Sequence, residues 1–218
     1  MSAETIQTII DDLGALLLFT MILIVAASQI SRAIYAVAAQ SLFIAIAGAV
    51  LATATGNVDL WVIAGVTLAV KATLLPWVLH WVVRRMNVRR EVEPVIPIAA
   101  TLVLAVAVVV MSFHLSASLG SVRQAITGNA LPVGIALTLT GVLVMATRKT
   151  ALSQMVGLFA SENGIFFTAM AVTQGMPLII EIGVILDVIL AALVMTIMVL
   201  RVRSTVDADI AELDRLRG

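Results

Sequence analysis

The sequence predicts an all-α integral membrane protein with seven transmembrane helices. Of its 218 residues, 61% are hydrophobic and only 12% are charged, and the mean hydropathy is +1.14. A soluble domain is about half apolar and about a quarter charged, so this chain lacks the polar residues to cover a water-exposed surface. Its apolar runs also reach the roughly 17 to 25 residues that a spanning helix needs, whereas barrel strands would be about ten residues long.

The expected helices are separated mostly by short joints. The first follows the segment Met1–Gly14, which carries acidic residues but no basic one. That composition is atypical of a signal peptide, so we expect this helix to be retained. The third contains Pro76, which is expected to kink it. In order, the expected spans are Leu13–Ser28, Ala33–Ala54, Val58–Val83, Val95–Ala117, Leu131–Thr147, Ala151–Val172 and Pro177–Leu200.

The basic residues predict the orientation. If the N-terminus lies outside, the first, third and fifth joints and the C-terminal tail face the cytoplasm, and they hold 11 of the 13 Lys and Arg residues. Only Arg123 lies outside, and Lys71 lies within a span. This asymmetry predicts an N-out/C-in, multi-pass protein of the inner (cytoplasmic) membrane, in contact with the lipid bilayer. The thirteen acidic residues balance the basic ones, which argues against a nucleic acid partner.

Two segments of the chain resemble each other. Residues Thr55–Val70 and Thr173–Val188 align without gaps and share identities such as Gly65 with Gly183. A parallel 3+1+3 repeat is one interpretation, and chance similarity between apolar helices is the other. We divide the chain accordingly into an N-terminal three-helix half, a linking helix four with its outer loop, a C-terminal three-helix half and a cytoplasmic tail. These parts are 1–94, 95–130, 131–203 and 204–218.

The few charges inside the spans are the main functional candidates, because a charge at the bilayer centre costs several kcal/mol. Lys71, Glu162 and Asp187 lie near the middle of the third, sixth and seventh spans. Glu181 lies about one turn from the outer end of the seventh. Burial disfavours the charged form of carboxyl groups and amines alike and moves their pKa values towards neutrality. We therefore predict a proton relay through Lys71, Glu162 and Asp187; the alternative is that they pair only to fix helix packing.

Other polar residues carry weaker signals. His80 lies near the inner end of the third span and His114 near the outer end of the fourth, so one haem held by both is not expected. With Glu181, His114 is a candidate for a secondary relay position. The chain has no cysteine, which excludes disulfides, iron–sulfur clusters and thiolate metal sites within it. No phosphate loop, metal-ligand cluster or nucleophile–base arrangement is recognisable, so we expect neither cofactor, metal nor catalytic centre in this chain.

Small residues surround the acid of the sixth span. Gly157 and Ser161 are four residues apart, as are Ala160 and Gly164. This spacing lets two helices approach closely, and it should place Glu162 against a neighbour. We expect that neighbour to be the seventh span or another subunit.

The stretch Arg148–Phe167 reads RKTALSQMVGLFASENGIFF. Its basic turn, its Gly-Leu-containing helix, and Glu162 followed by Asn163 resemble the small K-type membrane subunit of respiratory complex I. The C-type subunit of multisubunit cation/proton antiporters is similar. With its additional N-terminal helices and the run SENGIFF, the whole chain resembles hydrogenase-4 component E.

The resemblance implies a non-redox subunit that relays protons in the membrane arm of a hetero-oligomeric group 4 [NiFe] hydrogenase, formate hydrogenlyase-like or complex I-like oxidoreductase, beside antiporter-like subunits. Glu162 would take the place of the family's helix-two carboxylate. Asp187 would take that of the third-helix acid, where Glu is usual in complex I. Lys71 has no counterpart in the three-helix subunits. The alternatives are a cation/proton antiporter or inorganic-carbon uptake subunit, and a purely structural membrane subunit.

Overall fold

The computed structural model describes residues 2–85, 94–118 and 129–173. In these ranges the chain is helical, and five helices are long and apolar enough to cross a membrane. The predicted helical membrane protein is therefore confirmed at this level. The seventh expected span, Pro177–Leu200, and the tail lie outside the described residues. The elements are α1 (Ala3–Ala26), α2 (Ile30–Thr55), α3 (Val58–Val66), the π-helix η1 (Thr67–Leu74), α4 (Leu75–Arg85), α5 (Ile98–Ser118), α6 (Ala130–Thr147) and α7 (Ala151–Thr173).

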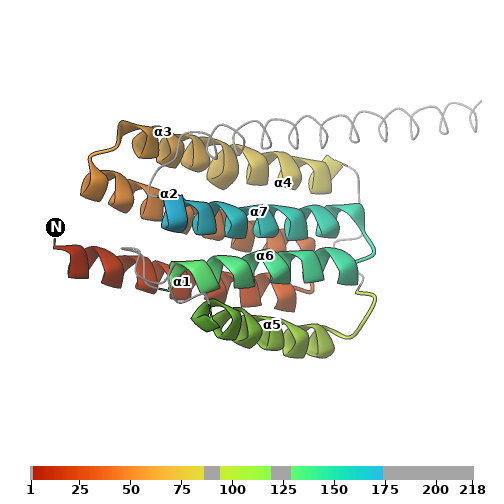
Figure 1. The fold of residues 1–218 in the computed structure, drawn as a ribbon. Coiled ribbons are helices and arrows are strands. Elements are labelled where there is room, and N and C mark those ends of the chain that lie inside the picture. The colour runs from red at the N-terminus through yellow and green to blue at the C-terminus, as the bar shows by residue number, and fades with distance from the viewer. Residues whose placement is uncertain (1, 86–93, 119–128, 174–218) are drawn as a thin grey trace, which may run out of the picture.

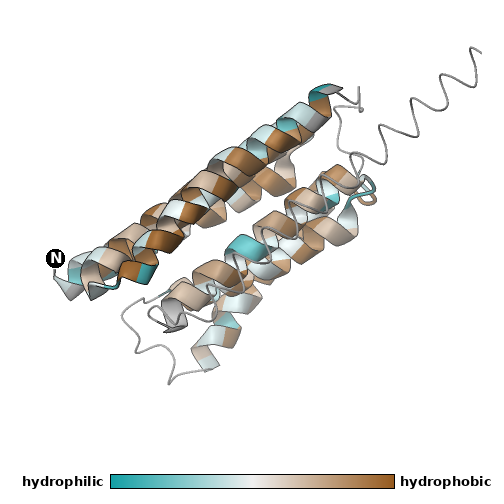
Figure 2. Cartoon of the chain, turned by 90° about the horizontal axis from the view of Figure 1, so that it is seen from above, coloured by the Kyte–Doolittle hydropathy of each residue, from teal (hydrophilic) through white to brown (hydrophobic). Residues whose placement is uncertain are grey.

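The helices lie side by side along one direction (Figure 1). Helices α1, α2, α7 and α6 form the centre, where α1 packs against α2 and α6, and α7 packs against the same two. Helix α5 covers the α1–α6 side, and the continuous helix α3–η1–α4 covers α2. Figure 2 shows brown and pale residues along most of each helix and teal mainly near the ends, as expected for helices that span a bilayer.

Two long-range contacts show that α1 and α6 run in the same direction. Just before α6 begins, the backbone N–H of Asn129 donates at 3.0 Å to Oδ1 of Asp11, which lies in the first half of α1. At their other ends, Arg148 Nη2 donates to the backbone oxygen of Val25 at 2.6 Å. A parallel repeat would require this shared direction; most of the second copy, Thr173–Val188, lies outside the described residues.

The first helix begins at Ala3 rather than at the predicted Leu13. Ser2 caps it, because its side chain accepts a hydrogen bond from the backbone N–H of Thr5 at 3.2 Å. Glu4 in the first turn also favours this start, since a negative charge there complements the helix dipole. The apolar run alone therefore underestimated the helix.

The third span is one continuous helix whose middle is widened. Its π segment, η1, ends just before Pro76, and the backbone N–H of Leu75 donates to the oxygen of Val70, five residues earlier. Proline has no N–H and cannot make an α-type bond to the carbonyl four residues before it. The predicted disturbance at Pro76 thus takes the form of a π-helix, which contains Lys71.

Helices α6 and α7 pack with their backbones nearly in contact. A Cβ atom added to Gly141 of α6 would lie 2.5 Å from the backbone nitrogen of Ser161, and one on Gly164 of α7 would lie 2.5 Å from that of Thr138. Gly134 and Gly157 repeat this seven-residue spacing on the two helices, and a Cβ atom on either would lie 2.9 Å from backbone atoms of the other helix. Gly157 and Gly164 of α7 therefore face α6, a contact that was not expected, while the expected seventh span lies outside the described residues.

Arg148 is a buried tie between helix ends rather than a solvated loop residue. It is 2% exposed, and its bond to Val25 supplies a donor to the carboxyl end of α1, where backbone oxygens lack helical partners. Burial lowers the pKa of Arg148, although the guanidinium stays charged at neutral pH because its ordinary pKa lies far above neutrality. Of the two basic residues between α6 and α7, only Lys149 is exposed. The contribution of this turn to the predicted orientation therefore depends on Lys149.

Replacing Arg148 with glutamine is expected to lower the free energy of unfolding by about 2 kcal/mol, the usual value of a hydrogen bond to a charged group. Thermal unfolding in detergent, followed by circular dichroism, would measure the change. Lys149→Gln is the matched control and should stay within about 0.5 kcal/mol, because that side chain is on the surface. Equal effects of the two substitutions would contradict the role given to Arg148.

Candidate functional site

Lys71 of η1 and Glu162 of α7 form an ion pair inside the bundle. Lys71 Nζ lies 3.1 Å from Glu162 Oε1, and the side chains are only 6% and 7% exposed. Each residue stands near the middle of its helix. The structure thus brings together two of the predicted mid-span charges, and Glu162 faces its own chain. Asp187 and Glu181 lie outside the described residues.

The elements around the pair hold the Lys71 ammonium in place. Its Nζ lies 5.5 Å from the centre of the Phe166 ring, which favours a cation over its face. Phe166 follows Glu162 by four residues, so one face of α7 presents the acid and the ring together. The π segment determines the side of the third span on which Lys71 emerges, because each residue's direction depends on the local helical twist.

A second buried polar contact lies beside the pair and was not predicted. Asn163 Nδ2 donates to Gln40 Oε1 and to Ser41 Oγ, each at 3.1 Å. All three residues are at most 1% exposed, and their bonds join α7 to the middle of α2. Because Asn163 adjoins Glu162, these bonds fix the rotation of α7 at the position of the acid. The sequence feature that could have predicted this contact is the pair Gln40-Ser41 in the middle of an apolar span. Polar groups within a membrane span need hydrogen-bonding partners.

A small cavity adjoins the pair between α2, η1–α4 and α7, with room for about one water molecule. Its polar lining consists of Ser41, Lys71, Glu162 and Asn163. The rest of the lining is apolar: Ile34, Val37, Leu75, Pro76, Leu79 and Phe159. A water molecule at the polar end would have hydrogen-bonding groups around it, whereas the apolar end offers none.

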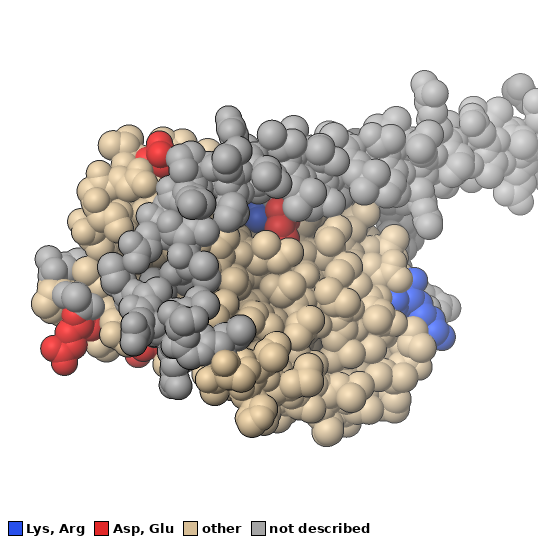
Figure 3. Space-filling view, viewed as in Figure 1, with Lys and Arg blue, Asp and Glu red and all other residues tan. Residues whose placement is uncertain are grey.

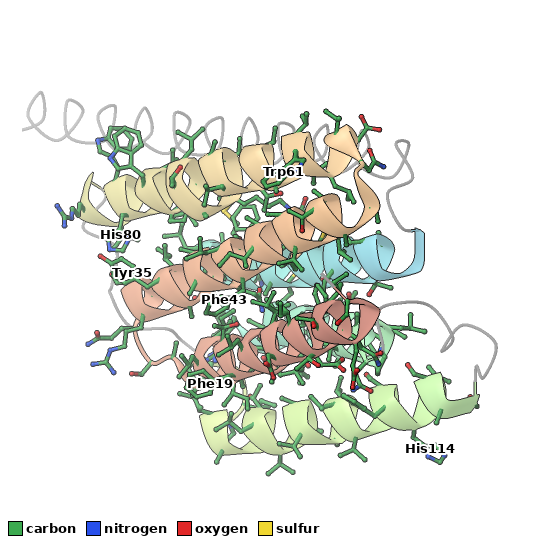
Figure 4. The ribbon with its side chains drawn as sticks, turned by 90° about the vertical axis from the view of Figure 1, so that its left-hand side faces the viewer. Phe19, Tyr35, Phe43, Trp61, His80 and His114 are labelled. Atoms are coloured by element: carbon green, nitrogen blue, oxygen red, sulfur yellow. The ribbon has the colours of Figure 1, made fainter. Side chains whose placement is uncertain are left out.

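The two histidines lie at opposite ends of the bundle, as predicted (Figure 4). His80 stacks on Tyr35 with 4.7 Å between ring centres, whereas His114 is exposed on α5 and points away from the other helices. Helix α5 packs against α1 and α6, so His114 is not brought to the Lys71–Glu162 pair. Within the described ranges, no group of three or more His, Asp or Glu side chains could hold a metal ion.

Charges on the face drawn in Figure 3 gather mainly at the two ends of the bundle, and one adjacent blue and red pair lies between them. Among the described residues, buried Asp, Glu and Lys side chains are confined to Lys71 and Glu162. A bilayer favours this distribution, since exposed charges remain in water and the buried ones neutralise each other.

Comparison with known proteins found one relative in Mycobacterium tuberculosis (strain ATCC 25618 / H37Rv), the uncharacterized protein Rv0085. The two chains are 35% identical over 152 residues, which cover 69% of each. No family model matches the chain. No solved structure matches it either. The resemblance to hydrogenase-4 component E therefore rests on the stretch Arg148–Phe167 and the layout of the helices.

Proposed function

The chain belongs to the same family as Rv0085 of Mycobacterium tuberculosis, and we propose that it is a membrane subunit that transfers protons through Lys71 and Glu162. The observation that carries this proposal is the 3.1 Å contact between a buried ammonium and a buried carboxylate in mid-span. Desolvation of two ions costs several kcal/mol each, and apolar residues of similar volume would pack there without that cost. A membrane helix that retains both charges is therefore a candidate for proton or ion movement.

The geometry suits proton exchange. The Lys71 ammonium can donate a proton to Glu162 across 3.1 Å, which leaves a neutral amine and a neutral carboxylic acid. In a low-dielectric interior the neutral pair is closer in free energy to the ion pair than it would be in water. The pair can therefore hold one proton on either side chain and pass it to a neighbouring acceptor. The predicted third group, Asp187, would extend this route.

The partners follow from the resemblance rather than from the pair itself. We place the chain in the inner membrane, beside antiporter-like subunits of a group 4 [NiFe] hydrogenase, formate hydrogenlyase-like or complex I-like oxidoreductase, with the redox centres in those partners. A cation/proton antiporter or inorganic-carbon uptake complex would use the same pair without electron transfer. Proton movement that needs no electron donor would favour this alternative.

Replacing Glu162 with glutamine is expected to lower proton movement by about 10²-fold, because an amide cannot take up and release the proton. Proton movement and electron transfer would be measured side by side in vesicles that contain the assembled complex. Asp187→Asn is the second test, and Glu4→Gln, at the exposed end of α1, is the control. If proton movement per electron is unchanged in both test variants, the relay is wrong and the structural role stands.

A further inference from the structure

Along α2 and the third span, the lining of the cavity beside the ion pair extends from the pair towards one end of the bundle. On α2 its lining runs from Ser41 back to Ile34, and on the third span it runs from Lys71 forward to Leu79. Because these consecutive helices are antiparallel, both stretches lead to the same end of the bundle. At 1.5 Å per residue the distance along each helix is roughly 10 to 12 Å, about two turns. On α2 and the third span, none of the lining residues lies beyond the pair towards the other end.

The lining residues on α7 extend towards the same end of the bundle. On α7 the lining consists of Phe159, Glu162 and Asn163, and Phe159 lies on the side of Glu162 nearer the start of that helix. Helix α7 starts after the turn at Arg148, which is tied to the carboxyl end of α1. The start of α7 and the end of α4 lie at the same end of the bundle (Figure 1).

Two polar aromatic residues, neither of which lines the cavity, lie toward the same end of the bundle (Figure 4). Tyr35 directly follows Ile34, and His80 directly follows Leu79; their rings stack at 4.7 Å. Tyr35 is 63% exposed and His80 is half-buried, so both have access to the surface. An imidazole can accept a proton on one nitrogen and donate one from the other.

We propose that this cavity is a one-sided access path along which protons move between the Lys71–Glu162 pair and the end of the bundle that carries His80. The proposal rests on the proposed proton transfer by the pair. It adds the side of the membrane from which protons reach the pair. Ser41 and Asn163 supply polar partners for water at the inner end. The part of the cavity that includes Val37 and Leu79 is lined by apolar side chains. Water is unfavourable there, so a continuous chain of water molecules forms only intermittently, as in hydrophobic gates. The distribution of Lys and Arg assigns this end to the cytoplasm.

The cysteine-free sequence allows a direct test. Ser41→Cys places a thiol at the inner end of the cavity, Leu42→Cys is the lipid-facing control at the same depth, and Ala45→Cys is buried one turn beyond the pair. Each variant of the full chain would be exposed to silver ions in right-side-out and inverted vesicles. Thiols that remain would then be labelled with maleimide after denaturation. Lys149→Cys, exposed at the His80 end, would mark the accessible side.

We expect the Ser41→Cys thiol to react about tenfold faster than Ala45→Cys, because water and silver ions reach the polar end of the cavity but not the packed site at Ala45. This reaction should occur only in vesicles in which Lys149→Cys is also accessible. Equal rates from both sides, reaction from the opposite side, or rates no higher than those of Leu42→Cys and Ala45→Cys would overturn the proposal. Val37→Cys, nearer the mouth, repeats the comparison if Ser41→Cys does not assemble.

The test separates the path from the proposed function, because thiol reactivity does not depend on proton movement. An unreactive cavity together with a defective Glu162→Gln variant would overturn the path alone. A reactive cavity with an unimpaired Glu162→Gln variant would overturn the function of the pair and leave a water-filled crevice.

Discussion

Replacing Lys71 alone with methionine is expected to lower the free energy of unfolding by about 3 kcal/mol, because it removes the cation that neutralises a buried carboxylate. The ammonium of Lys71 lies 3.1 Å from Glu162 Oε1, and both side chains are almost fully enclosed. Methionine retains the length and most of the volume of lysine, so the loss would report the charge rather than a cavity. Denaturant unfolding in detergent micelles would measure it.

The double variant Lys71→Met with Glu162→Met is expected to recover most of that loss, since replacing both members of a buried pair with apolar residues is often neutral. Arg32→Met, at an exposed position near the start of α2, is the control and should stay within about 0.5 kcal/mol. A Lys71→Met cost no greater than that of the control would contradict the importance of the pair to the fold.

The same double variant also separates structure from function. It would preserve the packing between the third span and α7 but remove both titratable groups. If the folded double variant still moved protons at the normal rate, the pair would be purely structural. Loss of proton movement from a stable double variant is the expected result.

Introducing leucine at Gly141 is expected to prevent stable packing of α6 on α7. Even an alanine Cβ at this position would lie 2.5 Å from the backbone nitrogen of Ser161 and 2.7 Å from the backbone oxygen of Gly157. No flexible side-chain end is available to move, so the two helices would have to separate. Gly141→Ala should therefore cost about 3 kcal/mol, at the upper end of the usual range for overpacking, and leucine should cost more.

Gly65 of α3 is the matched control for this prediction. It is also a helical glycine, but apart from its own helix backbone and its chain neighbours no atom lies within 4 Å of where its Cβ would be. Gly65→Ala should be neutral or stabilise the helix by up to about 1 kcal/mol, because alanine has the higher helix propensity. The yield of folded protein in detergent and its midpoint of thermal unfolding would compare the variants. Similar values for Gly141→Ala and Gly65→Ala would refute the close contact.

The sequence was sufficient to select Lys71 and Glu162, because charges inside apolar spans are rare and costly. It could not show that they meet, since nothing in hydropathy or spacing relates the third span to the sixth. The bonds from Asn163 to Gln40 and Ser41 were missed for a similar reason: neutral polar residues in spans stand out less than charges. Their importance depends on which groups lie opposite them.

The helix positions were predicted better than their details. The limits of α6 and α7 agree with the apolar runs to within one residue, because Thr147, Arg148 and Thr150 interrupt hydropathy there. The start of α1 was missed, since it depends on a cap by Ser2 and not on apolar residues. The π segment was missed because it differs from an α-helix only in which backbone oxygen each N–H bonds. The hydrophobic pattern of the side chains does not report that difference.

The π segment has a consequence for how this family can vary in length. A π turn corresponds to an α-helix with one extra residue accommodated, so losing one residue between Thr67 and Leu74 would leave a regular helix with its backbone bonds intact. Because the wider turn absorbs the extra residue, the α-helical parts on either side would keep nearly the same relative orientation after such a loss. A family member with that deletion would keep its span and the neighbours of α3 and α4, but the residues of the π segment, Lys71 among them, would be presented differently. A one-residue gap here is therefore a change at the ion pair rather than along the whole helix.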